Sequence, residues 1–312
     1  MEKILDLPLV REDEDNICLP LVISVITRYW HEPIPLEEAK SRTRLYPNMK
    51  ASIMIEGIEL AEKHKFKAYT YQGSINDLRK RIDQGLPPIV IMPGIKDVVQ
   101  HALVIQGYDG KKILTYIPQP NSIGAIDEHK FNMLWQEDDN LTLLIVPDDM
   151  SIYVKDELRF LQSNRASFEA ERLRIFAKYE EAIELLNRFK GERNVRIYYM
   201  LGILYSDIKR YDDARNHYEE SLSINKRFYL SYRALGNLYL KLKDYSKAEE
   251  YYSKAIEINP TRFAPIYKNR AIARLEINAK EDALKDLQLY LTYNPDAYDK
   301  SSIEMAIRDL IH

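Results

Sequence analysis

A sequence pattern with a fixed period constrains the C-terminal half of this chain more than any other feature. The pattern Y-x-x-L-G-x-x-Y occupies 198–205 and recurs over 232–239, a shift of 34 residues. Further positions match at the same shift, namely Tyr211 with Tyr245, Ala214 with Ala248, and Tyr218 with Tyr252. Because one such unit is too small to bury its apolar face alone, the period predicts stacked helical hairpins.

Small residues occupy the positions at which the paired helices would meet. They are Gly202, Gly236 and Ala271 on the first helices, and Ala214, Ala248 and Ala283 on the second helices. Small side chains allow close approach, and larger apolar residues at 3–4 spacing fill the remaining groove. A third unit runs from Tyr267 to Pro295 with one residue inserted, and a weaker earlier unit contains Ala170 and 179–182.

These units resemble the tetratricopeptide repeat family over 163–297, about four repeats in all. The resemblance implies a solenoid whose groove binds a peptide or protein partner. Arg233 and Asn237 lie four apart, on one helical face, and Lys268 and Asn269 occupy nearby positions in the next unit. These four residues resemble part of the carboxylate clamp of some family members. The alternative is that they form a solvated polar face of the groove.

The last segment, 298–312, is predicted to be a helix that covers the end of the stack. Ser301-x-x-Glu304 has the spacing of a capping box, in which the serine begins a helix. Between the two halves, 150–162 carries Ile152, Val154, Leu158 and Leu161 at helical spacing, so this connector is also predicted to be helical.

The N-terminal half, 1–149, has a different pattern, with helices first and strands afterwards. Helical periodicity covers 21–30, 35–43 and 52–64, and Ser74-x-x-Asp77 begins a further short helix. Apolar β-branched runs follow at 66–71, 89–92, 102–106, 113–116 and 141–146. Asp109-Gly110 separates two of these runs and is a hairpin signal. This order predicts an α+β domain with a mostly antiparallel sheet.

The single cysteine, Cys18, is the first candidate for a reactive group. Pro20 follows it, and proline is tolerated in the first turn of a helix because its missing N–H is not needed there. The sequence therefore predicts a helix that begins near Cys18, where the helix dipole and free N–H groups lower a thiol's pKa. The alternative is an inert thiol in the core.

His101 is the second candidate, because it begins a predicted strand before the hairpin. An ordered series links it to the cysteine: Cys18 at a helix start, L-P-P-I-V-I at 86–91, H-x₅-G-Y-D-G at 101–110, and F-x₃-W at 131–135. The series resembles the papain-like cysteine peptidases that process double-glycine leaders of bacteriocins, over 8–147. The resemblance implies Cys18 as the nucleophile and His101 as its general base and later acid.

Three positions depart from that family. Its oxyanion-hole glutamine corresponds to Glu12, its glycine after the cysteine to Leu19, and its orienting Asp or Asn to Ile117. A carboxylate at Glu12 would repel an oxyanion, Leu19 would narrow the space beside the nucleophile, and loss of the orienter leaves the imidazole tautomer unset. Acidic residues at 13–15 would raise the thiol pKa.

Composition excludes several other classes of function. The net charge is −3, which argues against a nucleic-acid partner. The histidines lack metal-ligand spacing and there is no Gly-rich phosphate loop, so no metal and no cofactor are expected. With one cysteine, no signal peptide and no apolar run that would span a bilayer, a cytoplasmic protein is expected. The oligomeric state is left open.

The sequence thus predicts an α+β papain-like N-terminal domain followed by an all-α tetratricopeptide-type solenoid. Three functions remain open. The first is a cysteine-peptidase-like protein whose repeats recruit the protein to be acted upon. The second is a catalytically inactive pseudoprotease that serves as an adaptor, and a transferase or amidase on the same fold is a third.

Overall fold

The computed structural model describes residues 2–10, 17–43, 53–94, 98–116, 123–154 and 157–311. The chain divides into two compact units. The first contains Met1–Met92 and His101–Ile197, and the second contains Pro93–Gln100 and Tyr198–His312. A mixed helix-and-strand region precedes an all-helical region, which confirms the predicted fold class. The domain limits drawn from the sequence stay a prediction.

The first unit is built on a sheet with the strand order β2-β7-β3-β4-β5-β6, with β1 paired to β4. The strands are β1 (Glu2–Ile4), β2 (Phe66–Gln72), β3 (Ile89–Pro93), β4 (Gln100–Asp109), β5 (Lys112–Tyr116), β6 (Ile123–Asp127) and β7 (Leu141–Pro147). The pairs β1–β4, β2–β7, β3–β7, β4–β5 and β5–β6 are antiparallel, as the sequence predicted. Neither β1 nor β6 was predicted, because both are short and β6 is interrupted by Gly124.

The helices of this unit confirm the two local signals that the sequence carried. They are α1 (Cys18–Tyr29), α2 (Leu36–Thr43), α3 (Met54–Lys63), α4 (Ile75–Asp83) and α5 (Glu128–Trp135). The first helix begins at Cys18, as Pro20 predicted. Ser74 caps α4, since its hydroxyl accepts a hydrogen bond from the backbone N–H of Asp77 at 3.1 Å.

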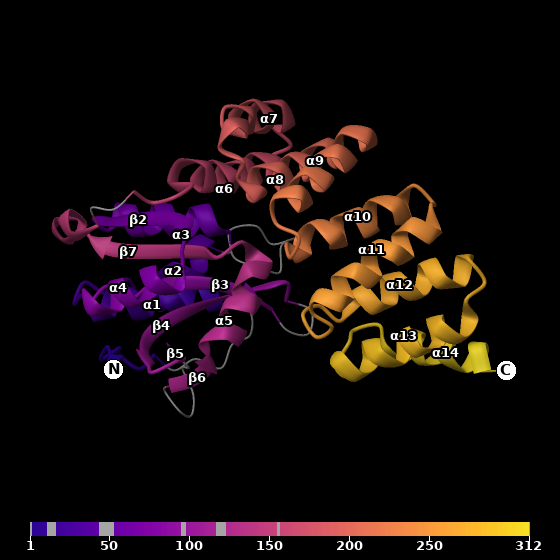
Figure 1. Ribbon diagram of the computed structural model, residues 1–312, viewed down its shortest axis with the longest axis horizontal. Coiled ribbons are helices and arrows are strands. Elements are labelled where there is room, and N and C mark those ends of the chain that lie inside the picture. The colour runs from indigo at the N-terminus through magenta and orange to yellow at the C-terminus, as the bar shows by residue number, and fades with distance from the viewer. Residues whose placement is uncertain are drawn as a thin grey trace. The chain divides into compact units, whose positions relative to one another are not determined.

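Two helices of the predicted repeat region, α6 (Leu161–Ile175) and α7 (Tyr179–Asn187), belong to the first unit. Figure 1 shows α6 beside β2 and α3. The guanidinium of Arg165 donates to both carboxylate oxygens of Glu62 on α3, at 2.5 and 2.8 Å. Arg172, two turns further along α6, donates to Glu59 of α3 at 2.7 Å. These ion pairs join α6 to a helix about a hundred residues earlier in the chain.

The second unit is a stack of antiparallel helices (Figure 1). They are α8 (Val195–Asp207, from Tyr198 onward), α9 (Tyr211–Ile224), α10 (Tyr229–Lys241), α11 (Tyr245–Ile258), α12 (Pro265–Glu276), α13 (Lys280–Tyr293) and α14 (Lys300–Ile311). The last helix begins at Lys300, so Ser301 lies inside it and the predicted capping box at Ser301 is wrong. The backbone N–H of Ile303 bonds to the carbonyl of Asp299 instead, which places the helix start earlier.

Gly202 and Gly236 allow the close helix approach that the period predicted. A Cβ on Gly202 would lie 2.4 Å from the ring of Tyr218, and a Cβ on Gly236 would lie 2.5 Å from the ring of Tyr252. Both tyrosines are buried. The glycine on each first helix therefore makes room for the tyrosine of its second helix.

The variant Gly236→Ala is expected to destabilise the second unit by about 1–2 kcal/mol. The added methyl group overpacks the helix pair, which costs about 1–3 kcal/mol, and alanine's better helix propensity offsets part of that loss. Urea unfolding followed by far-UV circular dichroism measures the change. Gly191→Ala is the control, because a Cβ there meets no atom within 4 Å. Equal losses in both variants would contradict the packing argument.

Candidate active site

Cys18 lies at the first position of α1 and is half-buried. Backbone groups of Ala102, Leu19 and Cys18 itself lie near its sulfur, and each of them lowers its pKa. Burial acts in the other direction and is the larger effect, so the pKa of the Cys18 thiol lies above its ordinary value. The helix start was predicted correctly, but its effect on the thiol is outweighed by desolvation.

His101 is the second residue of β4, directly before Ala102. Because the backbone of Ala102 reaches the Cys18 sulfur, the structure brings the cysteine to the residue that follows the histidine. The two candidates, 83 positions apart in the sequence, therefore lie in one region of the first unit. No local sequence signal predicted the contribution of Ala102, because it comes from the main chain.

The His101 ring keeps solvent-accessible surface. Protein atoms around it nevertheless desolvate it and hold its pKa below the ordinary value. Burial is the only cause of this shift, so among the described residues no carboxylate acts on the imidazole charge.

The pKa shifts of Cys18 and His101 have opposite signs, and they determine the charge of each group. A thiol with a raised pKa stays protonated at neutral pH, and an imidazole with a lowered pKa stays neutral. At neutral pH Cys18 is therefore a neutral thiol and His101 a neutral imidazole. A histidine in this state can accept a proton, as a general base must.

Of the three positions that depart from the peptidase pattern, only Leu19 lies within the described residues; Glu12 and Ile117 lie outside them. The Leu19 side chain is 4% exposed. A Cβ on Gly57 of α3 would meet Leu19 Cδ2 at 3.2 Å, so the leucine packs against this glycine. The Leu19 side chain therefore packs in the core, and its effect on the space beside the nucleophile stays a prediction.

The predicted groove residues of the repeats fall into two groups. Asn237 of α10 accepts hydrogen bonds from the Tyr252 hydroxyl at 2.8 Å and from Asn269 of α12 at 3.5 Å. The Arg233 guanidinium lies 5.0 Å from the centre of the Phe263 ring. Lys268 instead pairs with Asp299 at 2.5 Å. A role for these four residues in binding a peptide stays a prediction.

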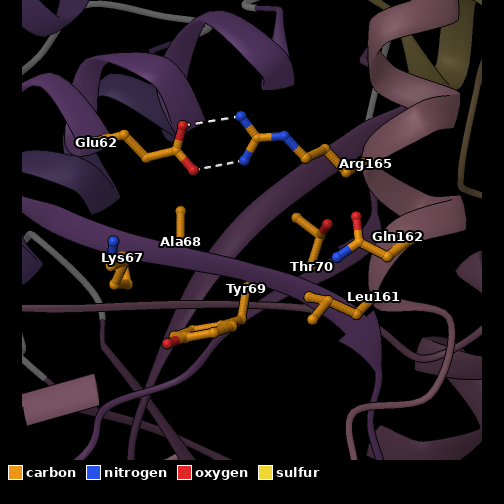
Figure 2. Close-up of a pocket in the computed structure, with 8 residues that line it drawn as sticks. All are labelled: Glu62, Lys67, Ala68, Tyr69, Thr70, Leu161, Gln162 and Arg165. Atoms are coloured by element: carbon orange, nitrogen blue, oxygen red, sulfur yellow. Dashed lines mark hydrogen bonds and ion pairs between the residues drawn. The ribbon is translucent and has the colours of Figure 1, made fainter. Parts of the chain in front are cut away.

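A pocket of about 190 Å³ opens elsewhere in the first unit, between β2, the end of α3 and the start of α6. Figure 2 shows its lining: Glu62, Lys67, Ala68, Tyr69, Thr70, Leu161, Gln162 and Arg165. The ion pair of Arg165 and Glu62 crosses it (Figure 2). Neither Cys18 nor His101 lines this pocket, so its position where α6 covers the edge strand β2 marks a packing junction, not the candidate active site.

The described residues lack the features of two other classes of site. Within the described ranges, no three His, Cys, Asp or Glu side chains are grouped so that they could hold a metal ion. Over the same part of the chain, no helix combines the length and the apolar character that a bilayer crossing needs.

Comparison with known proteins finds a family match in each half of the chain. The protein-family model described as Peptidase C39 family matches residues 6–149, and two tetratricopeptide repeat models match 195–228 and 229–262. None of the curated proteins matches this chain.

Several solved structures are similar to parts of it. One is a double glycine motif protease from an AMS/PCAT transporter in complex with the leader peptide, at 17% identity and a TM-score of 0.38, covering 46% of this chain and 94% of that one. Another is MamA, at 22% identity and a TM-score of 0.39, covering 42% and 73%. A third is the Arabidopsis OM64 TPR domain, at 23% identity and a TM-score of 0.34, covering 37% and 94%.

The family matches agree with the sheet, the helix that begins at Cys18 and the stacked helical hairpins described above. Residues 6–149 of this chain are a Peptidase C39 domain, and residues 195–262 are tetratricopeptide repeats.

Proposed function

We propose that this protein acts on a peptide through Cys18 and His101, and that its repeats hold the protein that presents the peptide. The observation that supports the first part most directly is the closeness of the Ala102 backbone to the Cys18 sulfur, whose pKa it lowers. It brings the only thiol of the chain next to the strand position that carries His101.

In the proposed reaction His101 is a general base. The neutral imidazole takes the proton of the Cys18 thiol as the sulfur attacks a peptide carbonyl, and it returns the proton to the leaving amine. Water then hydrolyses the thioester. The first turn of α1 carries the backbone N–H groups of Cys18 and Leu19, which are the donors available to a developing oxyanion because Pro20 has none.

The second candidate is an adaptor that binds a peptide without cleaving it. The raised pKa of the Cys18 thiol and the lowered pKa of the His101 imidazole favour it, because papain-type catalysis benefits from a thiolate. Glu12 and Ile117, at the positions of the family's oxyanion and orienting groups, also favour the adaptor.

For the repeats, we propose that the groove binds a polar segment of a partner protein. Arg233, Asn237 and Asn269 support this role, since two amides and a guanidinium provide donors for a peptide carboxylate. Lys268 contributes less directly, because Asp299 pairs with its ammonium group.

The test is the pH dependence of Cys18 alkylation in the wild type and in His101→Ala. A general base that assists the thiol gives the wild type a rate plateau between the two pKa values. In the variant only the thiolate reacts, so the alkylation rate falls tenfold with each pH unit below the thiol pKa. At neutral pH we expect the variant to react about 10- to 100-fold more slowly, at or below the lower range for general-base assistance.

His129→Ala is the control, because His129 is an exposed histidine on α5 of the same unit and should leave the profile unchanged. If the wild type and His101→Ala give the same profile, the dyad is not functional, and the adaptor becomes the better hypothesis. Alkylation reports on one site, since Cys18 is the only cysteine.

A further inference from the structure

The turn between β3 and β4 belongs to the same compact unit as the repeats. Pro93–Gln100 clusters with Tyr198–His312, although the strands on either side belong to the first unit. The contact within this unit is specific, because the Nε of Arg262 donates a hydrogen bond to the backbone carbonyl of Val99 at 3.0 Å. These residues are 163 positions apart.

Arg262 is held firmly at this position. Its side chain is 0% exposed, and its guanidinium lies 4.5 Å from the centre of the ring of Tyr229, which is itself buried. A buried guanidinium stacked on a fixed aromatic ring has little freedom to move, and its planar group directs its donors in fixed directions. The Val99 carbonyl therefore accepts from a donor whose place is set by the repeats.

The same carbonyl also closes the turn. The N–H of Gly94 donates to it at 3.1 Å. Gly94 and Val98 approach so closely that a Cβ on Gly94 would clash with the Val98 carbonyl oxygen. Gly94 and Arg262 thus both donate hydrogen bonds to the carbonyl of Val99.

His101 follows Val99 by two residues, in a strand that starts at Gln100. A strand advances only about 3.3 Å per residue, so the Cα of His101 lies within about 7 Å of that of Val99 along the chain. A shift or rotation at the Val99 carbonyl would therefore be transmitted to the His101 backbone. Ala102, whose backbone lies near the Cys18 sulfur, is the next residue.

We propose that Arg262 is a positioning residue for His101: by fixing the Val99 carbonyl, it sets the start of β4 and with it the position of the His101 backbone. The proposal rests on the proposed function, because it gives the repeats a part in the Cys18–His101 chemistry in addition to binding a partner. Arg262 itself touches no reacting atom in this account.

The test is a double-mutant cycle of Arg262→Lys and His101→Ala, with the rate of Cys18 alkylation by iodoacetamide at neutral pH as the readout. Lysine keeps the buried charge and the apolar stem but lacks the Nε–H that arginine directs at the carbonyl. We expect Arg262→Lys to slow the reaction about fivefold in the presence of His101 and to have no further effect in the His101→Ala protein, within the range of couplings between residues of one network.

Two further variants complete the design. Arg210→Lys is the matched control, because Arg210 also stacks on a tyrosine, 4.7 Å from the ring centre of Tyr205, but lies on the repeat surface. Its alkylation rate should equal that of the wild type. Gly94→Ala disturbs the same carbonyl from the other side and should reproduce the His101-dependent loss, which keeps the test decisive if Arg262→Lys folds poorly.

The outcomes separate the two proposals. A loss that appears equally with and without His101, or no loss in either Arg262→Lys or Gly94→Ala, overturns the positioning role and leaves the dyad standing. If His101→Ala itself fails to slow alkylation, the proposed function fails first and the positioning role fails with it.

Discussion

Replacing Asp286 with alanine is expected to destabilise the repeat unit by about 3–5 kcal/mol, the usual loss when one member of a buried ion pair is removed. The Asp286 side chain is 1% exposed. Its carboxylate accepts hydrogen bonds from Arg270 at 2.7 and 2.9 Å and from Arg274 at 2.9 Å. Without the carboxylate, the buried guanidinium of Arg270 loses the partner that offsets its desolvation.

Chemical denaturation followed by far-UV circular dichroism measures this loss. Asp282→Ala is the matched control, because Asp282 lies one turn earlier on α13 and pairs with Lys285 at the surface. The control should leave the unfolding midpoint unchanged, since exposed ion pairs contribute little. A midpoint for Asp286→Ala that matches the control would show that the Arg270 charge is solvated by other means.

Removing the Trp135 side chain should cost the Peptidase C39 domain a similar amount, about 3–5 kcal/mol, as expected for a large aromatic residue in a core. Trp135 is 0% exposed, and its indole N–H donates to the Leu141 carbonyl at 3.1 Å. The ring packs against Phe131, with 5.6 Å between centroids, and closely enough to Gly73 to exclude a Cβ there. Trp135→Ala therefore leaves a cavity and an unpaired carbonyl.

Trp30→Ala is the comparison, because Trp30 is the only other tryptophan and its indole N–H also donates to a carbonyl, that of Ile145, at 3.1 Å. Trp30 is only partly buried, so its loss should be clearly smaller. Calorimetry resolves which transition moves, and equal shifts in both variants would contradict the cavity argument.

The candidate site shows which features local sequence signals can predict and which they cannot. Pro20 predicted the start of α1 at Cys18 because proline's preference for a helix's first turn acts within a few residues. The pKa of the thiol could not be predicted in the same way. It depends on burial and on the backbone of Ala102, and both are set by elements far away in the sequence.

For Leu19 and Lys268 too, the sequence could not predict which residues their side chains contact. The sequence could not show that the Leu19 side chain packs in the core against Gly57 on α3. Lys268 was expected in the groove, and its ammonium group pairs with Asp299, 31 positions later. In both cases the deciding partner lies on another element.

The sequence by itself determined the helical hairpins, the α+β order of the first half, the cap at Ser74 and the helix start at Cys18. These features follow from periodicity and from hydrogen bonds that span three or four residues, so they can be recognised locally. The tertiary structure alone decided that α6 joins the first unit through Arg165 and Glu62, and that the Val99 carbonyl is held by Arg262. The reason is physical, since ion pairing and desolvation depend on which distant side chains burial brings together.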